Sequence, residues 1–454
     1  MLHALRGLTL CVALGLVAAQ PAVAAPQALT ADELRAAARA ALKTGQPDVT
    51  IQLATALVAR DPGDVSALLL LARAQRDVGA YRPALTAAKQ AWSAAETDLQ
   101  HYASAVVIAQ VYSSSGARTR AQIWLRRAAE TAPDDRLKAK AVKDFRYVRD
   151  RNPWTTNLSF AITPSSNINN GSKSEIVEID GLPFVLSGDA RALSGMEYRF
   201  DIDTEVSRQM RDNLWVFAAG DVSVRRYSLS GDAKQQAPNL DASDLNYTEA
   251  ELTLGFTVFP TPKSGPLTVS AAAGRGWYAG DPLVDFYTIS ADQTVLLSPA
   301  DRLNFMLVGN QQNRVQDPIN NSQSWTLQTA WSHKRRNADS MNLAFSISDT
   351  ASDGAAVANQ AWSASVAYAR AKPIAGAQIS FALSYEDKLY DRPYFSSERR
   401  ADQTATAEIS LFLPKVELYG FAPEISFLAK QSDSNVGLYE TVEYGMSVGI
   451  RSTF

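Results

Sequence analysis

Histidine limits the catalytic chemistry open to this chain. The sequence contains three histidines, His3, His101 and His333. A zinc site built from histidines needs several imidazoles at short spacing, and a hydrolytic site needs a histidine between a nucleophile and an acidic residue. His333 is the best candidate, but it precedes the basic run 334–336 at the expected end of a strand. We therefore interpret His333 as an interfacial polar residue rather than a catalytic base.

Two further patterns contain residue types found in binding sites. Asp349 and Asp353 flank an expected loop and offer the oxygen ligands that Ca²⁺ takes, yet solvated loop acids are the commoner case. Gly274-Arg275-Gly276 is a kink in a strand and not a phosphate loop, because no helix follows it. The sequence therefore assigns no catalytic, metal-binding or cofactor-binding residue, and we expect a protein that is not an enzyme and has no cofactor.

The N-terminus is typical of a secretory signal peptide covering residues 1–24. Arg6 supplies the basic region, the segment 7–19 is apolar, and Ala22-Val23-Ala24 offers a cleavage site with Ala22 and Ala24 at the small positions. Cys11, the single cysteine, lies within this segment. The mature chain is therefore expected to lack disulfides and thiol chemistry.

Charge is distributed unevenly, although the formal net charge is only −3. Residues 28–150 contain 18 Lys or Arg against 13 Asp or Glu, whereas residues 151–454 contain 25 against 34. The first excess fits a solvated helical surface and gives no reason to expect nucleic acid binding. The mean hydropathy of −0.15 excludes a helical membrane protein, so any membrane domain is expected to be a barrel.

The segment 25–152 has the pattern of paired helices. Gly45, Gly79 and Gly116 recur at spacings of 34 and 37 residues, each at the expected end of a helix. Within the segment 56–92, alanine and leucine occupy positions much as in a tetratricopeptide repeat. About three repeats fit, and such a solenoid usually binds a peptide or protein. A generic alanine-rich helical bundle is the alternative interpretation.

At Asn152-Pro153 the helical pattern gives way to alternating apolar and polar residues. We expect about fourteen strands in the segment 153–454. The predicted strands are 154–164, 192–206, 213–227, 246–259, 266–278, 285–297, 301–313, 323–335, 339–349, 360–371, 375–387, 402–413, 418–430 and 439–454. Their connectors alternate between long and short, with a short exception at 279–284, as in outer-membrane barrels. A soluble sandwich gives no reason for this alternation.

The last strand carries the strongest membrane signal. One face is apolar and ends on an aromatic residue at the carboxy terminus, which resembles the signal that the outer-membrane assembly machinery reads. The residues of this predicted assembly signal are Tyr444, Met446, Val448, Ile450 and Phe454. The charged Glu443 and Arg451 share the other face. A buried edge strand of a sandwich is the alternative.

The first connector of the barrel contains the most distinctive local sequence, ITPSSNINNGS. Its turn-forming residues predict a structured loop that folds into the lumen or over its mouth. They are Pro164, Ser165, Ser166, Asn167, Asn169, Asn170 and Gly171. Together with the preceding helical repeats, the proline boundary and the terminal phenylalanine, this motif resembles the surface lipoprotein assembly modifier family across essentially the whole mature chain.

The resemblance implies an outer-membrane translocon with fourteen strands that delivers lipoproteins or related soluble proteins to the cell surface. We expect the helical domain to lie in the periplasm and capture a client, which the barrel then exports. The expected partners are outer-membrane lipids, the barrel assembly machinery and that client, and we expect a monomer. The alternatives are a general or selective porin with a protein-binding domain and, with less support, an exopolysaccharide exporter, whose relatives carry more repeats.

Overall fold

The computed structural model describes residues 29–261 and 264–454. The predicted signal peptide, with Ala22, Ala24 and Cys11, lies outside these residues. The chain divides into two compact units, the first ending at Ala95 and the second running from Glu96 to Phe454. The second unit therefore contains helices as well as all the strands.

Helices precede the first strand, and several begin at side chains that accept hydrogen bonds from the first turn. Thr30 and Thr97 form capping boxes with Glu33 and Gln100, and Asp64 accepts from the Ala67 amide. In the first unit the helices are α1 (Ala31–Lys43), α2 (Pro47–Arg60), α3 (Val65–Asp77) and α4 (Tyr81–Ser93). In the second they are α5 (Asp98–Ser114), α6 (Arg118–Glu130) and α7 (Asp135–Arg149).

Glycines end alternate helices where the sequence predicts breaks. Gly45, Gly79 and Gly116 follow α1, α3 and α5 with φ angles of +72°, +80° and +84°, the left-handed conformation that closes a helix. The seven helices α1–α7 in the described part of the chain are thus consistent with repeats. None of the helices in the described ranges has the length and apolar character needed to cross a membrane.

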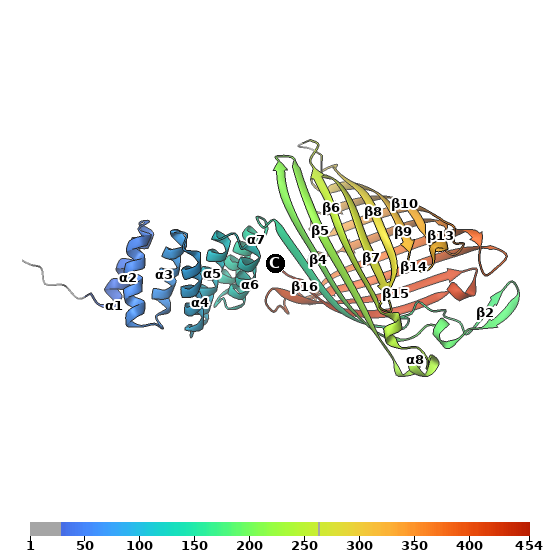
Figure 1. Cartoon of the computed structure of the whole chain (residues 1–454), viewed down its shortest axis with the longest axis horizontal. Helices are drawn as coiled ribbons and strands as arrows, with labels where there is room; N and C mark the ends of the chain where they lie inside the picture. Colours follow the sequence, from blue (N-terminus) through green and yellow to red (C-terminus); the bar gives the residue numbers. More distant parts are fainter. Residues whose placement is uncertain (1–28, 262–263) are drawn as a thin grey trace, which may run out of the picture. The chain divides into compact units, whose positions relative to one another are not determined.

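Fourteen strands close into an antiparallel barrel, in which each strand pairs with its neighbours along the chain and β1 pairs with β16 (Figure 1). The barrel strands are β1 (Trp154–Ser165), β4 (Gly195–Arg211), β5 (Leu214–Leu229), β6 (Tyr247–Val258), β7 (Leu267–Tyr278), β8 (Asp281–Leu296), β9 (Asp301–Arg314), β10 (Ser322–Lys334), β11 (Ser340–Ser352), β12 (Asn359–Ala369), β13 (Gln378–Pro393), β14 (Arg399–Phe412), β15 (Phe421–Ser434) and β16 (Thr441–Ser452). The predicted fold class is confirmed.

The outer face of the barrel is apolar. On β6, Leu252, Leu254 and Phe256 remain 60%, 58% and 40% exposed, while the intervening Glu251 and Thr253 point inward. Strands such as β11 and β16 repeat this two-residue alternation. These apolar side chains cover the outer face of the barrel. Contact with water would be unfavourable for them, whereas contact with lipid tails is not, so the outer face fits a position in a membrane.

The two ends of the barrel differ in their connectors. We call the end where β1 begins and β16 ends the terminal end, and the opposite end the distal end. At the distal end, residues 166–194 and 230–246 form long connections. The expected short exception is also present there: β7 and β8 are joined by Ala279 and Gly280 with φ angles of +53° and +92°, as in a two-residue hairpin.

Several connectors differ from the sequence-based expectation, among them the turn expected at 372–374, which extends over residues 370–377. The predicted long loop 388–401 is mostly strand, because β13 and β14 stay paired from Leu389–Ala401 out to Pro393–Arg399 across a bulge. The turn expected at 414–417 extends over residues 413–420. Its last residues, Tyr419 and Gly420, accept hydrogen bonds from Arg126 on α6.

The long distal connections have a small core of their own. Buried Leu193 precedes β4, Leu229 ends β5, and Ala233 and Leu245 follow β5; Ile168 packs against this cluster. The short strands β2 (Ile176–Ile179) and β3 (Leu182–Val185) form a hairpin in the first connection (Figure 1). The distal loops are therefore packed structures.

Candidate functional site

One wall of the barrel interior is acidic. We use the name acidic wall for the inward carboxylates of β4, β5 and β6, which are Glu197, Asp201, Asp203, Glu205, Asp221, Glu249 and Glu251; Arg199 and Arg225 lie on the same face. Asp203, Asp221 and Glu251 are neighbours in register across the three strands. No group of three or more metal-ligating side chains in the described ranges is arranged to hold a metal ion. Because these carboxylates outnumber Arg199 and Arg225 on the same face, the acidic wall gives this side of the lumen a net negative field.

The strands farther along the sheet present small polar side chains to the interior. The hydroxyls of Ser346 and Ser363 lie 2.8 Å apart, and those of Ser410 and Ser426 lie 2.7 Å apart. These pairs stand between strands β11 and β12 and between β14 and β15. The lumen is thus polar on both sides, and long apolar groups are disfavoured inside it.

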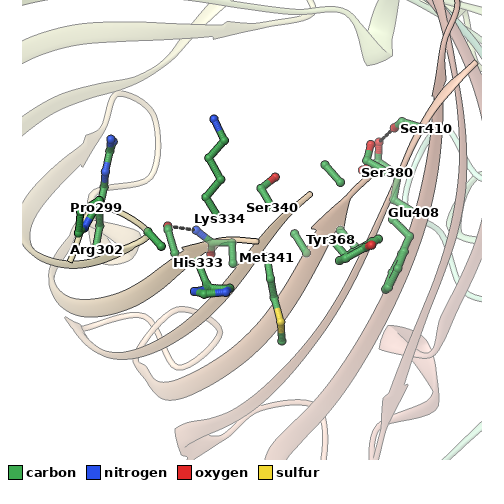
Figure 2. Close-up of a pocket in the computed structure, with 17 residues that line it drawn as sticks. Pro299, Arg302, His333, Lys334, Ser340, Met341, Tyr368, Ser380, Glu408 and Ser410 are labelled. Atoms are coloured by element: carbon green, nitrogen blue, oxygen red, sulfur yellow. Dashed lines mark hydrogen bonds between the residues drawn. The ribbon is translucent and has the colours of Figure 1, made fainter. Parts of the chain in front are cut away.

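A hollow of about 570 Å³ lies near the terminal end, between β9 and β14. Arg302 and Lys334 stand on one side of it, and Glu408 and Ser410 stand on the other (Figure 2). Ser410 donates to Glu408 at 3.1 Å. The hollow is therefore a polar part of the lumen that carries charges of both signs.

His333 lies on the side of its strand opposite Lys334 (Figure 2). Its Nδ1 is 2.8 Å from Asp301, which also accepts from the Trp331 indole, and its ring stacks on Trp331 at 5.4 Å. The nearby hydroxyl of Ser298 donates to the same carboxylate. This arrangement of a histidine stacked on tryptophan beside a carboxylate fits the interpretation of a polar interfacial cluster.

The loop motif of the first connector forms a hydrogen-bonded structure at the distal end. The Asn167 side chain donates to the Gly171 carbonyl and accepts from the Gly171 amide. The Asn169 side chain donates to the carbonyls of Asp189 and Arg191 and accepts from the Leu193 amide. The two asparagines therefore join both ends of the first connection through its backbone.

The remaining motif residues complete this structure. Ser165 donates to Glu443, and the amide of Ser166 donates to the Tyr444 carbonyl, so the motif is also tied to β16. Asn170 adopts a φ of +52°, and a Cβ at Gly171 would lie 2.4 Å from the Arg191 backbone. Pro164 belongs to β1 and pairs with Met196. The motif thus packs the mouth of the barrel at the junction of its first and last strands.

The predicted assembly signal lies on the outer face of β16. Tyr444, Met446, Val448 and Ile450 are 65%, 39%, 42% and 54% exposed. Ser447, between two of them, is paired with Ser426 on the inner face. Val448 therefore faces lipid and Ser447 faces the lumen, so a charge placed at each position tests which face of β16 is outside.

We expect Val448→Arg to destabilise the inserted barrel by roughly 2–4 kcal/mol, since it places a charge against lipid near the middle of the strand. Ser447→Arg, one residue away, places the same charge in the polar lumen and should be tolerated. Urea unfolding of both variants in lipid vesicles, followed by tryptophan fluorescence, measures the difference. Equal destabilisation by the two substitutions would refute the assigned faces.

Phe454 has a partner that the sequence pattern does not reveal. The guanidinium of Arg126 on α6 lies 4.7, 4.4 and 4.8 Å from the ring centres of Phe145, Phe421 and Phe454. We call these four residues the Arg126 cluster. Phe145 and Phe454 also meet edge to face, with ring centres 5.3 Å apart. Cation–π and aromatic contacts of this kind fix the last residue of the chain.

Hydrogen bonds extend the Arg126 cluster to the β14–β15 turn and to the end of β16. Arg126 donates to the carbonyls of Tyr419 and Gly420 at 3.2 and 3.0 Å and to the Ser452 hydroxyl at 2.8 Å. Burial lowers the pKa of Arg126, while Glu417 raises it; an arginine keeps its charge at neutral pH despite such a shift. Glu130 accepts from the Tyr419 amide at 2.9 Å. The terminal end of the last hairpin is therefore bound by α6.

Comparison with solved structures finds proteins of low sequence identity. The Yersinia enterocolitica type III secretion translocator chaperone SycD is 16% identical, with 27% of this chain and 88% of that chain covered and a TM-score of 0.24. Acinetobacter baumannii OccAB3 is 8% identical over 65% of this chain and 98% of that one, with a TM-score of 0.35. A bacterial polysaccharide outer membrane secretin is 11% identical over 65% and 98%, with a TM-score of 0.34.

A comparison with curated protein sequences found no match. The family model for the surface lipoprotein assembly modifier matches residues 154–454, which begin at the first residue of β1 and end at Phe454. The match covers every strand of the barrel. It also covers the loop motif and Phe454, which belongs to the Arg126 cluster. The chain is an outer-membrane β-barrel protein that belongs to the surface lipoprotein assembly modifier family.

Proposed function

We propose that the chain exports a lipid-anchored protein to the cell surface, with the helices capturing the client in the periplasm and the barrel passing it outward. The observation that carries this proposal is the family match over the entire barrel. A protein that modifies the assembly of surface lipoproteins has to act on a client carrying both a polypeptide and acyl chains.

The arrangement within the second unit supports a combined action of helices and barrel. Helix α6 is bound to the β14–β15 turn through Arg126 and Glu130, and Lys138 on α7 lies 3.3 Å from Glu417 in the same turn. A helical domain serving only as a flexible appendage would not need these contacts. The acidic wall also favours clients whose unfolded segments carry basic residues.

Diffusion of small solutes is a second candidate function, and the polar lumen favours it. Both the acidic wall and the serine pairs would suit hydrated cationic solutes. The two functions differ in what a cell loses when the chain is removed, so one experiment addresses both.

We expect cells without the chain to lose surface exposure of one or more lipoproteins. Cells with and without the chain are treated with a membrane-impermeant biotin reagent, and labelled lipoproteins are quantified against their total amount in the outer-membrane fraction. Surface labelling should fall while the total stays constant, because the client would still reach the membrane.

The matched control is complementation with the wild-type chain, which should restore labelling. Uptake of a small cationic dye is measured in the same cells. An unchanged set of labelled lipoproteins would contradict the export proposal. If dye uptake falls while lipoprotein labelling is unchanged, the result supports the porin function over the export function.

A further inference from the structure

The seam that closes the barrel is short. β1 pairs with β16 at Ala161, Ile162 and Ser165, whereas the same strand pairs with β4 at all twelve positions from Trp154 to Ser165. β16 likewise pairs with β15 at twelve positions, from Thr441 to Ser452. Within the described strands, the half of β1 nearest the terminal end thus pairs only with β4. It is left with an unpaired strand edge, which a fully closed barrel does not have.

At its distal end the seam is held by the hydrogen bond from Ser165 to Glu443, but side chains add little nearer the terminal end. Two of the three β16 residues paired with β1 are Gly445 and Gly449. A Cβ built on Gly449 would lie 3.9 Å from the Ala161 Cβ and 3.0 Å from the Phe160 carbonyl. Because cross-strand side-chain pairs are a main source of sheet stability, the part of this junction nearest the terminal end separates at low cost.

The same pair of helices holds both strands of the seam. Helix α7 ends at Arg149 and β1 begins at Trp154, so α7 leads almost directly into one side. On the other side, the Arg126 cluster holds Phe454, Arg126 bonds to Ser452, and Arg149 donates to the Phe454 carbonyl at 3.3 Å. A movement of α6 against α7 would therefore act directly on the distance between β1 and β16.

We propose that the β1–β16 seam opens between the lumen and the membrane during export, and that the Arg126 cluster holds it closed at rest. This inference rests on the proposed export of a lipid-anchored client. The polar lumen disfavours acyl chains, and an open seam lets them stay in the membrane while the polypeptide crosses inside the barrel. The route thus suits a client with both parts.

A disulfide across the seam tests the opening. The variant Ala161→Cys/Gly449→Cys joins the two strands at a predicted Cβ separation of 3.9 Å, close to the ordinary disulfide value. No mature cysteine competes, since the single cysteine lies in the expected signal peptide. The matched control, Ala367→Cys/Ala382→Cys, joins in-register residues of β12 and β13, which are paired over eleven positions.

Surface biotin labelling of the lipoproteins that depend on the wild-type chain is the measurement, and heat-modifiable gel migration verifies that each variant is folded. The seam disulfide should abolish labelling under oxidising conditions, reduction should restore it, and the control disulfide should leave it unchanged. Labelling at the wild-type level with the seam disulfide formed overturns the seam proposal. If the wild-type chain itself supports no labelling, the proposed function has failed instead.

A measurement without a client tests the Arg126 cluster. Purified full-length chain in a planar bilayer is compared with Arg126→Ala and with Arg127→Ala, a neighbouring arginine that lies over Trp124. Loss of the cluster should increase the frequency of large-conductance openings, and adding the seam disulfide to Arg126→Ala should suppress them. Arg127→Ala should behave as the wild type. Identical recordings from Arg126→Ala and the wild type overturn the role given to the cluster.

Discussion

Deletion of Phe454 is expected to reduce folded barrel in the outer membrane to a small fraction of the wild-type amount. The residue ends the apolar strand expected to be read during assembly, and its ring also contacts Arg126 and Phe145. Loss of a half-buried aromatic ring with a cation–π partner costs about 2 kcal/mol. Heat-modifiable migration of outer-membrane fractions measures the folded amount.

Two further variants separate the signal from the packing. Phe454→Tyr keeps an aromatic end and should fold nearly as well as the wild type. Arg126→Ala keeps Phe454 but removes its cationic partner, so it should assemble normally and unfold at lower urea. A normal folded yield after deletion of Phe454 would show that the carboxy-terminal residue is not part of an assembly signal.

The barrel was predictable because its determinants are local. Alternation along single strands, such as Leu252 to Phe256, fixes which side chains face lipid, and Ala279-Gly280 has the short turn that the sequence indicates. The error at 388–401 arose because this segment is rich in charged and turn-forming residues. There, backbone pairing between β13 and β14 overrides local propensity.

The Arg126 cluster could not be predicted from one sequence. Arg126 is separated from Tyr419 by 293 positions and from Ser452 by 326, and one arginine among many on a solvated helix carries no distinguishing pattern. The loop motif is an intermediate case. Its residues indicated a structured turn, but the partners of Asn169, the carbonyls of Asp189 and Arg191, follow from the folded connection.

Removal of residues 31–95, the described helices of the first unit, should leave the barrel inserted and end client display. The deletion keeps α5, α6 and α7, so Arg126 and Glu130 still bind the β14–β15 turn. The strands satisfy their own backbone hydrogen bonds by pairing. Stability should therefore change little, whereas surface labelling of dependent lipoproteins should fall to the level of cells without the chain, if α1–α4 hold the client.

Removal of residues 31–150 is the informative comparison, because it also deletes Arg126 and Phe145. This longer deletion frees Phe454 and the turn at Tyr419 and should lower the urea midpoint of the barrel, while the shorter one should not. Heat-modifiable migration, urea unfolding and surface labelling on the same three proteins distinguish the roles. Normal display from the shorter deletion would move client capture to α5–α7 or to the barrel itself. Equal urea midpoints for both deletions would show that the Arg126 cluster adds nothing to barrel stability.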